Sequence, residues 1–233
     1  MLLNYDFMND VLERHYKVRD GLGWYHGTGH IRKVLDMLWR MQIDEPALSD
    51  DMEYVLEYAA LYHDAVYVPG SRDNEKWSAE VALDEAKNVE LTDCERKYVE
   101  QLILSTDVER VLGSAQVDMS WIAGTPGANE WWTAHNRLHD ADWSMFRCWD
   151  EMLDSEDDLM REAEAAAVTR FGQDCDKSAT ALKGRLAFLE RVLEHVDSGK
   201  KLYALPAMQR YERQAALNIR AMISRIEDEL ADG

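Results

Sequence analysis

Cysteine is scarce in this chain, and its few cysteines are widely separated. Cys94, Cys148 and Cys175 form no C-x-x-C pair, and their number is odd. This pattern predicts neither a disulfide framework nor a zinc knuckle, because both need closely spaced or paired cysteines. We therefore expect three free thiols, as in a reducing compartment.

Long apolar runs are also missing. No apolar run approaches the length of a bilayer, and the segment from Met1 to Asp6 lacks the basic and long apolar regions of a signal peptide. The sequence thus predicts no membrane segment and no membrane partner. Together with the expected free thiols, this favours a cytoplasmic location.

Basic residues are outnumbered: 26 lysines and arginines stand against 45 acidic residues, which gives a formal charge of −19. Such a surface repels a phosphate backbone and argues against binding of long nucleic acid. We expect any phosphorylated partner to be a small molecule, bound by local positive charge or by a metal. The composition leaves open whether the chain forms an oligomer.

The chain is instead rich in helical periodicity. Of its 233 residues, 46% are hydrophobic and 30% charged, which suits a globular core. No segment alternates convincingly at the strand period, and no linker or repeat interrupts the pattern. We predict one all-α domain over residues 1–233, with C-terminal helices of about 174–230 packed on the core. The expected helices cover residues 5–18, a segment that follows 24–31 and closes at 46, then 50–67, 73 onward, 92–104, 131–145, 155 onward, 176–196 and 206–230.

Several of these helices begin with a capping residue. The expected caps are Asp50 or Asp51, Asp73, Thr92 with Glu95, and Ser155 in the run Ser155-Glu156-Asp157-Asp158. Between residues 105 and 129 the periodicity lapses, which predicts a long loop of a length that is often functional.

The most informative stretch is Leu61-Tyr62-His63-Asp64-Ala65-Val66-Tyr67, where an imidazole and a carboxylate stand side by side in an apolar helical run. A buried carboxylate costs several kcal/mol unless it is paired, and a divalent cation satisfies both side chains at once. We therefore interpret His63 and Asp64 as metal ligands. The alternative is that His63 packs in the core and Asp64 ends a helix.

The His-Asp pair belongs to a longer series. His30 precedes it, an aspartate near residue 142 follows it, and each of these residues lies on or beside a different predicted helix. Two imidazoles and two carboxylates give mixed nitrogen and oxygen coordination, which suits Mn, Fe, Co, Mg or Zn. The series predicts a divalent metal site between helices, with open positions for water and substrate oxygens.

These residues lie in motifs that resemble, in order, those of the HD-domain superfamily of metal-dependent phosphohydrolases, and within it a bacterial group of predicted phosphohydrolases. The resemblance covers most of the chain. The matching motifs are Tyr25-His26…His30-Ile31, Leu61 to Tyr67, Asp73-Asn74-Glu75…Ser78-Ala79, Leu138-His139-Asp140-Ala141-Asp142 and Tyr211-Glu212-Arg213…Ala216…Asn218. The fold that the resemblance implies is a helical HD-domain bundle with its metal site between helices.

The resemblance also implies roles. It makes His30, His63, Asp64 and Asp142 the metal ligands, with Asp140 as the second choice to Asp142. The Tyr-His-x-x-x-His element is similar to that of cyclic-nucleotide phosphodiesterases, in which the first histidine protonates the leaving oxygen. His26 is thereby a general-acid candidate, and its ring could reach the same cavity if the helix has begun by residue 26.

The chain departs from the group at three places around this site. Gly23 and Gly27 stand where the group usually has Arg and Asn, and Asp107-Val108-Glu109 stands where a histidine is common. These departures affect the rim of the expected site rather than its metal ligands. A substrate cannot be carried over from the family on this basis.

Four further residues have two interpretations each. Glu75 could act as a general base or bind a metal-bound water, with Asp73 beside it, but acidic residues in a first helical turn are also explained by the helix dipole. Arg185 and Arg213 could bind a substrate phosphate through a bidentate fork, or form internal salt bridges.

The expected function is a metal-dependent hydrolase of a small phosphoester, such as a nucleotide or related phosphate. The cleavage could be of a phosphomonoester, a phosphodiester or a pyrophosphate. Two alternatives remain open from the sequence: a non-catalytic metal- or nucleotide-binding sensor module, and an HD-type di-iron oxygenase. His26 and Glu75 favour an enzyme over a sensor, and the shortage of further motif histidines disfavours the oxygenase.

Overall fold

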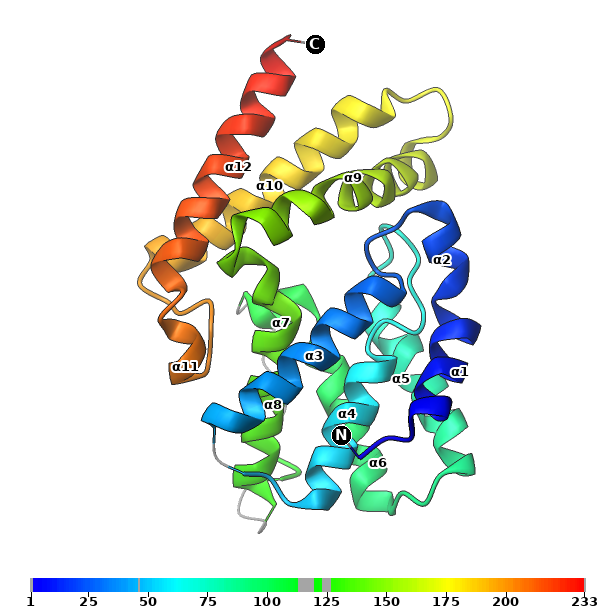
Figure 1. The fold of residues 1–233 in the computed structure, drawn as a ribbon. Coiled ribbons are helices and arrows are strands. Elements are labelled where there is room, and N and C mark those ends of the chain that lie inside the picture. Colours follow the sequence, from blue (N-terminus) through cyan, green and yellow to red (C-terminus); the bar gives the residue numbers. More distant parts are fainter. Residues whose placement is uncertain (1, 46, 113–119, 123–126, 233) are drawn as a thin grey trace.

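The computed structural model describes residues 2–45, 47–112, 120–122 and 127–232, and all of their regular secondary structure is helical (Figure 1). The predicted all-α class is confirmed. The helices are α1 (Tyr5–His15), α2 (Lys17–Leu22), α3 (Thr28–Asp44), α4 (Asp50–Tyr62), α5 (Asn74–Glu85), α6 (Asp93–Leu104), α7 (Val108–Val111), α8 (Ala128–Asp142), α9 (Trp149–Phe171), α10 (Lys177–Asp197), α11 (Pro206–Gln209) and α12 (Glu212–Asp232), with short 3₁₀ turns at η1 (Ala86–Asn88) and η2 (Trp143–Arg147).

Helix α4 is the centre of the N-terminal part. It packs against α3, α5, α6 and α8, and every residue from Val55 to Tyr62 is buried. Helix α1 also contacts it. A helical stretch that is buried on all sides needs such a cover, which explains why several helices surround the second half of α4. The residues that follow α4 are consequently delivered to the interior of the molecule.

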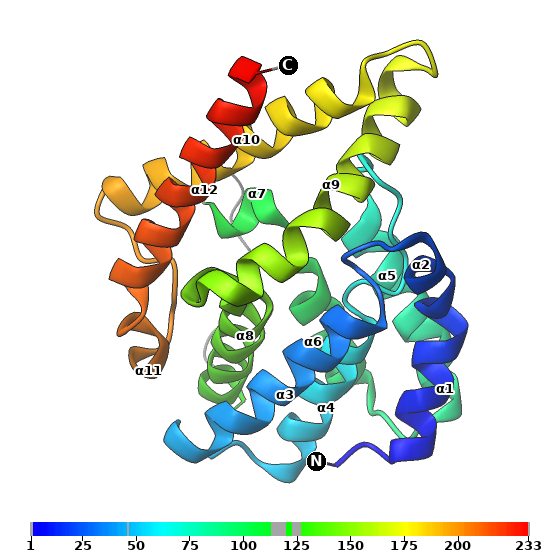
Figure 2. The same cartoon turned by 45° about the horizontal axis from the view of Figure 1, so that its top comes forward.

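The C-terminal helices form a second group. Figures 1 and 2 show α9, α10 and α12 gathered at one end of the molecule, beyond α3, α4 and α8. Helix α10 packs on both α9 and α12, and α12 also packs on η2. Buried side chains of these helices, such as Leu189 and Ile226, belong to the same hydrophobic cluster as Leu3 and Val11 near the N-terminus.

The helix around His63 is shorter than predicted. Its expected extension to Tyr67 is wrong, because α4 ends at Tyr62 and His63 occupies the C-cap position. The buried guanidinium of Arg19 donates to the carbonyls of Asp64 and Ala65, and this contact competes with continuation of the helix. His63 and Asp64 therefore lie in a turn at the helix end.

Three other helix boundaries also differ from the sequence prediction. Ser155 does not start a helix: it lies inside α9, where its hydroxyl donates to the carbonyl of Glu151. The expected helices over 5–18 and 206–230 are each divided in two, as α1 with α2 and α11 with α12. Of the predicted 105–129 loop, residues 108–111 form α7, and 113–119 and 123–126 lie outside the described residues.

The capping predictions were partly correct. Thr92 and Glu95 form the expected reciprocal capping box. Helix α4 is capped by Ser49, which accepts from the Met52 amide, rather than by Asp50 or Asp51. Asp73 occupies the N-cap position of α5, but its side chain makes no capping hydrogen bond.

The structure also bears on the cysteines and on the apolar runs of the chain. Cys94, Cys148 and Cys175 are free thiols, as predicted. Within the described part of the chain, no helix is both long enough and apolar enough to cross a membrane.

Candidate metal centre

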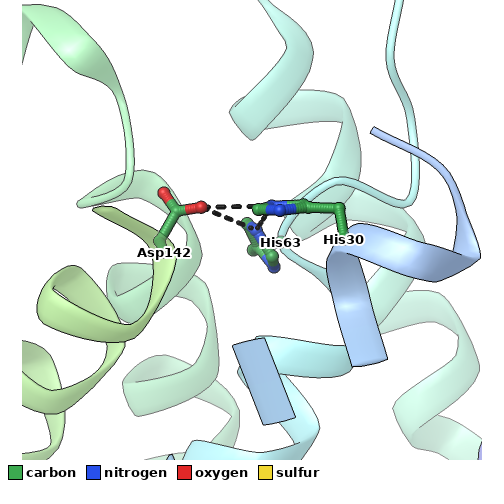
Figure 3. A group of neighbouring side chains, drawn as sticks. All are labelled: His30, His63 and Asp142. Carbon is green, nitrogen blue, oxygen red and sulfur yellow. Dashed lines mark hydrogen bonds and ion pairs between the residues drawn. The ribbon is translucent and has the colours of Figure 1, made fainter. Parts of the chain in front are cut away.

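Three helices bring a buried cluster together. His30 comes from the first turns of α3, His63 from the turn after α4, and Asp142 from the last residue of α8 (Figure 3). His30 Nε2 lies 3.1 Å from Asp142 Oδ1, and His63 Nε2 lies 3.6 Å from the same oxygen. The two Nε2 atoms are 3.3 Å apart. These three side chains can hold a metal ion, since their ligand atoms all lie within 4.8 Å of one another.

Asp64 lies against the same two imidazoles. Its Oδ2 is 3.1 Å from His63 Nε2 and 3.3 Å from His30 Nε2. All four residues that the sequence suggested as ligands therefore lie together, with both aspartates against both imidazoles. The mutual spacing within 4.8 Å holds for His30, His63 and Asp142, and Asp64 adds a fourth oxygen beside the imidazoles. A set of two imidazoles and two carboxylates fits a divalent ion without specifying which one.

The orientation of His63 supports this fit. Its Nδ1 lies 2.8 Å from the carbonyl oxygen of Ala60, one turn back along α4, so Nδ1 carries the proton and donates. The lone pair of the neutral ring is then on Nε2, which faces the cluster. Metal-binding histidines are commonly oriented by such a bond to their second nitrogen.

The cluster is electrostatically suited to a cation. Burial opposes charging of His30 and His63, but their contacts with Asp64 and Asp142 outweigh it and raise the pKa of both imidazoles. Burial acts to raise the pKa of the two carboxylates, yet the imidazoles bring it below the usual range of an aspartate. Positive charge at this point is thus favoured by both acids.

The turn that carries His63 and Asp64 is held from α1 and α2. Arg19 Nη1 donates to the Asp64 carbonyl at 2.6 Å, and Nη2 donates to the Ala65 carbonyl at 3.1 Å. The Tyr16 hydroxyl donates to the Leu61 carbonyl at 2.7 Å. The last carbonyls of a helix have no partner within it, and these donors supply one.

A cavity of about 510 Å³ opens over the cluster and reaches Asp64 and Asp142. Its size is in the range of small-molecule sites. His26, Glu75 and Arg185 line it, so three of the residues predicted for catalysis or substrate binding face the same space as the cluster.

His26 lines the cavity, but it is not positioned by helix α3 as the sequence suggested. Helix α3 begins at Thr28, so His26 precedes it and does not share a helical face with His30. The His26 ring stacks on Tyr67 with centroids 4.0 Å apart, and lies 5.6 Å from the His30 ring. Its Nδ1 is 2.7 Å from Glu162 Oε2, which leaves Nε2 for the cavity.

Gly27 is required by the way α3 begins. The carboxylate of Asp20 binds both the amide and the hydroxyl of Thr28, at 2.8 and 2.6 Å. A Cβ added at Gly27 would lie 2.3 Å from the same carboxylate. Asp20, which binds the first turn of α3, therefore packs directly against Gly27 and leaves no room for a side chain there.

Glu162 lines the cavity and binds His26, and it was not among the residues predicted from the sequence. It is 3% exposed, and besides the His26 ring it accepts the His26 amide at 2.7 Å. A signal was present, since Glu162 shares a helical face with Leu159 and Ala166, and an acid beside apolar residues of a buried face needs a partner.

The remaining predicted residues separate into two groups. Glu75 lines the cavity, and burial, together with Asp107 and Asp64, raises its pKa. Arg185 also lines the cavity but forms a bidentate ion pair with Glu156 at 3.0 to 3.3 Å, the internal salt bridge that was its alternative. Asp73 and Arg213 are exposed and do not line the cavity.

Asp140, the second choice as a ligand, has a different role. Its two oxygens accept the amides of Ala204 and Leu205 at 2.7 and 2.8 Å, and so hold the segment before α11 against α8. Burial raises its pKa to about 7, against the effect of these amides. The second aspartate of the Asp-Ala-Asp element is thus the one that faces the imidazoles.

The fold and the site define an all-helical protein with a buried His/Asp cluster at the floor of a small-molecule cavity. Comparisons with family models, with curated proteins and with solved structures found no match to this chain. Assignment of an activity therefore rests on the site itself.

Proposed function

We propose that this chain is a metal-dependent hydrolase of small phosphoesters, related to the HD-domain superfamily, with a nucleotide or similar phosphate as its substrate. The observation that carries the proposal is the convergence of His30, His63, Asp64 and Asp142 at the floor of one cavity. In this proposal all four hold the ion, which is Mn, Fe, Co, Mg or Zn.

A divalent ion held by these four residues would supply an acidified water and positive charge to offset the charge that develops on the phosphoryl group. The other tasks fall to side chains of the cavity. His26 protonates the leaving oxygen through Nε2, while Glu162 holds the ring by its Nδ1. Glu75 accepts the proton of the attacking water, and burial favours this role because it raises the pKa of the carboxyl and makes the carboxylate a stronger base.

Substrate binding falls to the guanidinium groups. Arg185 keeps its orientation through Glu156, and its Nη1 makes no hydrogen bond to another described residue. In this proposal Nη1 donates a hydrogen bond to a phosphate oxygen of the substrate. Arg72, which also lines the cavity, adds a second cation. Asp73 and Arg213 have no part in it.

The test is metal analysis of the purified protein followed by a phosphate-release screen over nucleotides and sugar phosphates. We expect a bound divalent transition metal, and phosphate release that chelation abolishes. His63→Ala should lose both the metal and the activity. His195→Ala is the matched control, because His195 lies on α10 outside the cluster, and it should keep both.

Two results would contradict the proposal. The first is full metal occupancy in a His63→Ala, Asp64→Ala double variant whose helical content is preserved. The second is a metal-loaded protein that binds phosphate esters without ever cleaving them, which would favour a sensor module.

A further inference from the structure

The cavity has two chemically different walls. One carries most of its carboxylates, including Asp64, Glu75 and Asp107. The other is formed by α9 and α10, whose charged members are each paired: Glu162 with His26, and Arg185 with Glu156. The rest of that second wall is apolar, with Leu159, Ala163 and Ala166 from α9, and Gly184 and Phe188 from α10.

Gly184 is the unusual member of this wall. It lies in the middle of α10, where glycine is less favourable than alanine by about 1 kcal/mol. A Cβ built on Gly184 meets no atom within 4 Å, so neighbouring atoms do not demand a glycine there. At Gly127, by contrast, an added Cβ would lie 2.6 Å from the Tyr98 hydroxyl.

Gly184 is an exposed residue of α10 and lines the cavity. Gly184 and Phe188 are one helical turn apart and therefore share a face, and both line the cavity. Trp143 lies within contact of the Phe188 ring, with centroids 6.3 Å apart, and lines the same space. An apolar group placed beside Gly184 would therefore lie against aromatic side chains.

The charges of the cavity restrict the other part of a ligand. Among the described lining residues, six are carboxylates and two, Arg72 and Arg185, are guanidinium cations. Arg185 is already neutralised in part by Glu156. Glu109 is likewise paired with Arg191. Because carboxylates outnumber cations in the lining, a chain of several phosphates would be repelled there more strongly than a single phosphate at the metal cluster.

Resting on the proposed function, we infer that the substrate carries a single phosphate esterified to an uncharged, ring-sized apolar group, and that Gly184 determines this preference by leaving room for the group between α9 and α10. A phosphate with a small alkyl group would leave most of the 510 Å³ cavity unfilled.

The test compares the binding of two non-hydrolysable probes, 1-naphthylphosphonate and methylphosphonate, to the purified metal-containing protein by calorimetry. Burial of the naphthyl group should make the first bind at least about ten-fold more tightly to the wild-type protein. Gly184→Leu should remove most of this preference while leaving methylphosphonate affinity within about two-fold, because the new side chain fills only the apolar space. Gly184→Ala should give an intermediate preference.

Ala187→Leu is the matched control. It adds the same side chain to an exposed position of α10 that does not line the cavity, and it should bind both probes as the wild type does. Equal affinity of the two probes for the wild-type protein would overturn the inference, as would a naphthyl preference that survives Gly184→Leu. Failure of the proposed function is distinguishable from either outcome, because it appears as absence of metal-dependent phosphate release, and the binding comparison needs no turnover.

Discussion

His26 owes its position to two acids rather than to helical periodicity. Helix α3 begins at Thr28, whose amide donates to Asp20, and Glu162 accepts from the amide of His26 and binds its ring. The sequence predicted His26 as a cavity residue because it could share a helical face with His30, and this reason is wrong, since α3 begins after His26. Both acids are distant in sequence from His26 or lie outside its motif, so only the folded chain shows the arrangement.

The first prediction concerns proton transfer by His26. His26→Asn should slow hydrolysis of an ester with a poor alkoxide leaving group by about 10²- to 10⁴-fold, and slow a nitrophenyl ester much less, because nitrophenolate needs little protonation. Steady-state rates on the two esters, with metal content measured alongside, make the comparison. Equal losses on both esters at unchanged metal content would make His26 a structural or general binding residue.

Glu162 should act through His26. Glu162→Gln keeps an oxygen that can accept the His26 amide but removes the charge beside Nδ1, so the same leaving-group difference should appear, with a loss of about ten-fold on the alkyl ester. Glu164→Gln, on the same helix and paired with Lys177, is the control. A loss that is equal for the two esters would show that Glu162 only supports the fold.

At the scale of whole helices, periodicity predicted where helices lie but not where they end. The capping box of Thr92 and Glu95 was predictable because both partners are close in sequence. The end of α4 was not, because it depends on Arg19, which lies far back along the chain. Ser155 misled the prediction because Asp158, three residues on, gives the spacing of a capping box. Within α9, however, Asp158 pairs with Arg161, and the Ser155 hydroxyl donates to the Glu151 carbonyl.

Glu85 joins three helices through its carboxylate. Arg14 and His15 of α1 and Tyr62 of α4 all bind it at the end of α5. Burial opposes its ionisation, but these partners lower its pKa to about 2 from an ordinary value of 4.5. The stabilisation is therefore complete above about pH 4.5 and is lost as the pH falls toward 2.

Glu85→Gln should accordingly lower the free energy of unfolding at pH 7 by about 1 kcal/mol, a modest value because solvent screens the partly exposed partners. The difference from wild type should shrink as the pH falls below 4.5. Urea denaturation at several pH values measures it. Glu80→Gln, at an exposed position of the same helix, should show little effect, and a Glu85→Gln difference that grows on acidification would contradict the assignment.

For the molecule as a whole, the net charge of −19 disfavours the approach of polyanions. Short phosphoesters should be hydrolysed and long DNA or RNA should be poor substrates, because repulsion of a polyanion accumulates along its length. Rates on a mononucleotide and on a long oligonucleotide, each measured at two salt concentrations, test this. Added salt should help only the long substrate; degradation of a long oligonucleotide faster than any mononucleotide at physiological salt would overturn the prediction.

Less of the site than of the fold could be predicted from the sequence. The four cluster residues lie in short motifs, and they were identified before their geometry was known. The second wall of the cavity was not identified from the sequence. Glu162 and Gly184 belong to no motif, and they line the same cavity only because α9 and α10 pack together. Arg213, placed in a motif, is exposed on α12 because its neighbours Ala215 and Ala216 take the buried face.

The hydrogen bonds from Tyr16 and Arg19 to the end of α4 link two equilibria. The carbonyls they bind belong to Leu61, Asp64 and Ala65, on either side of His63. Docking of the N-terminal segment thus organises the same turn that an ion at the cluster would organise. By reciprocity, ion binding must slow amide hydrogen exchange in α1 and α2 by as much as undocking of these helices weakens ion affinity.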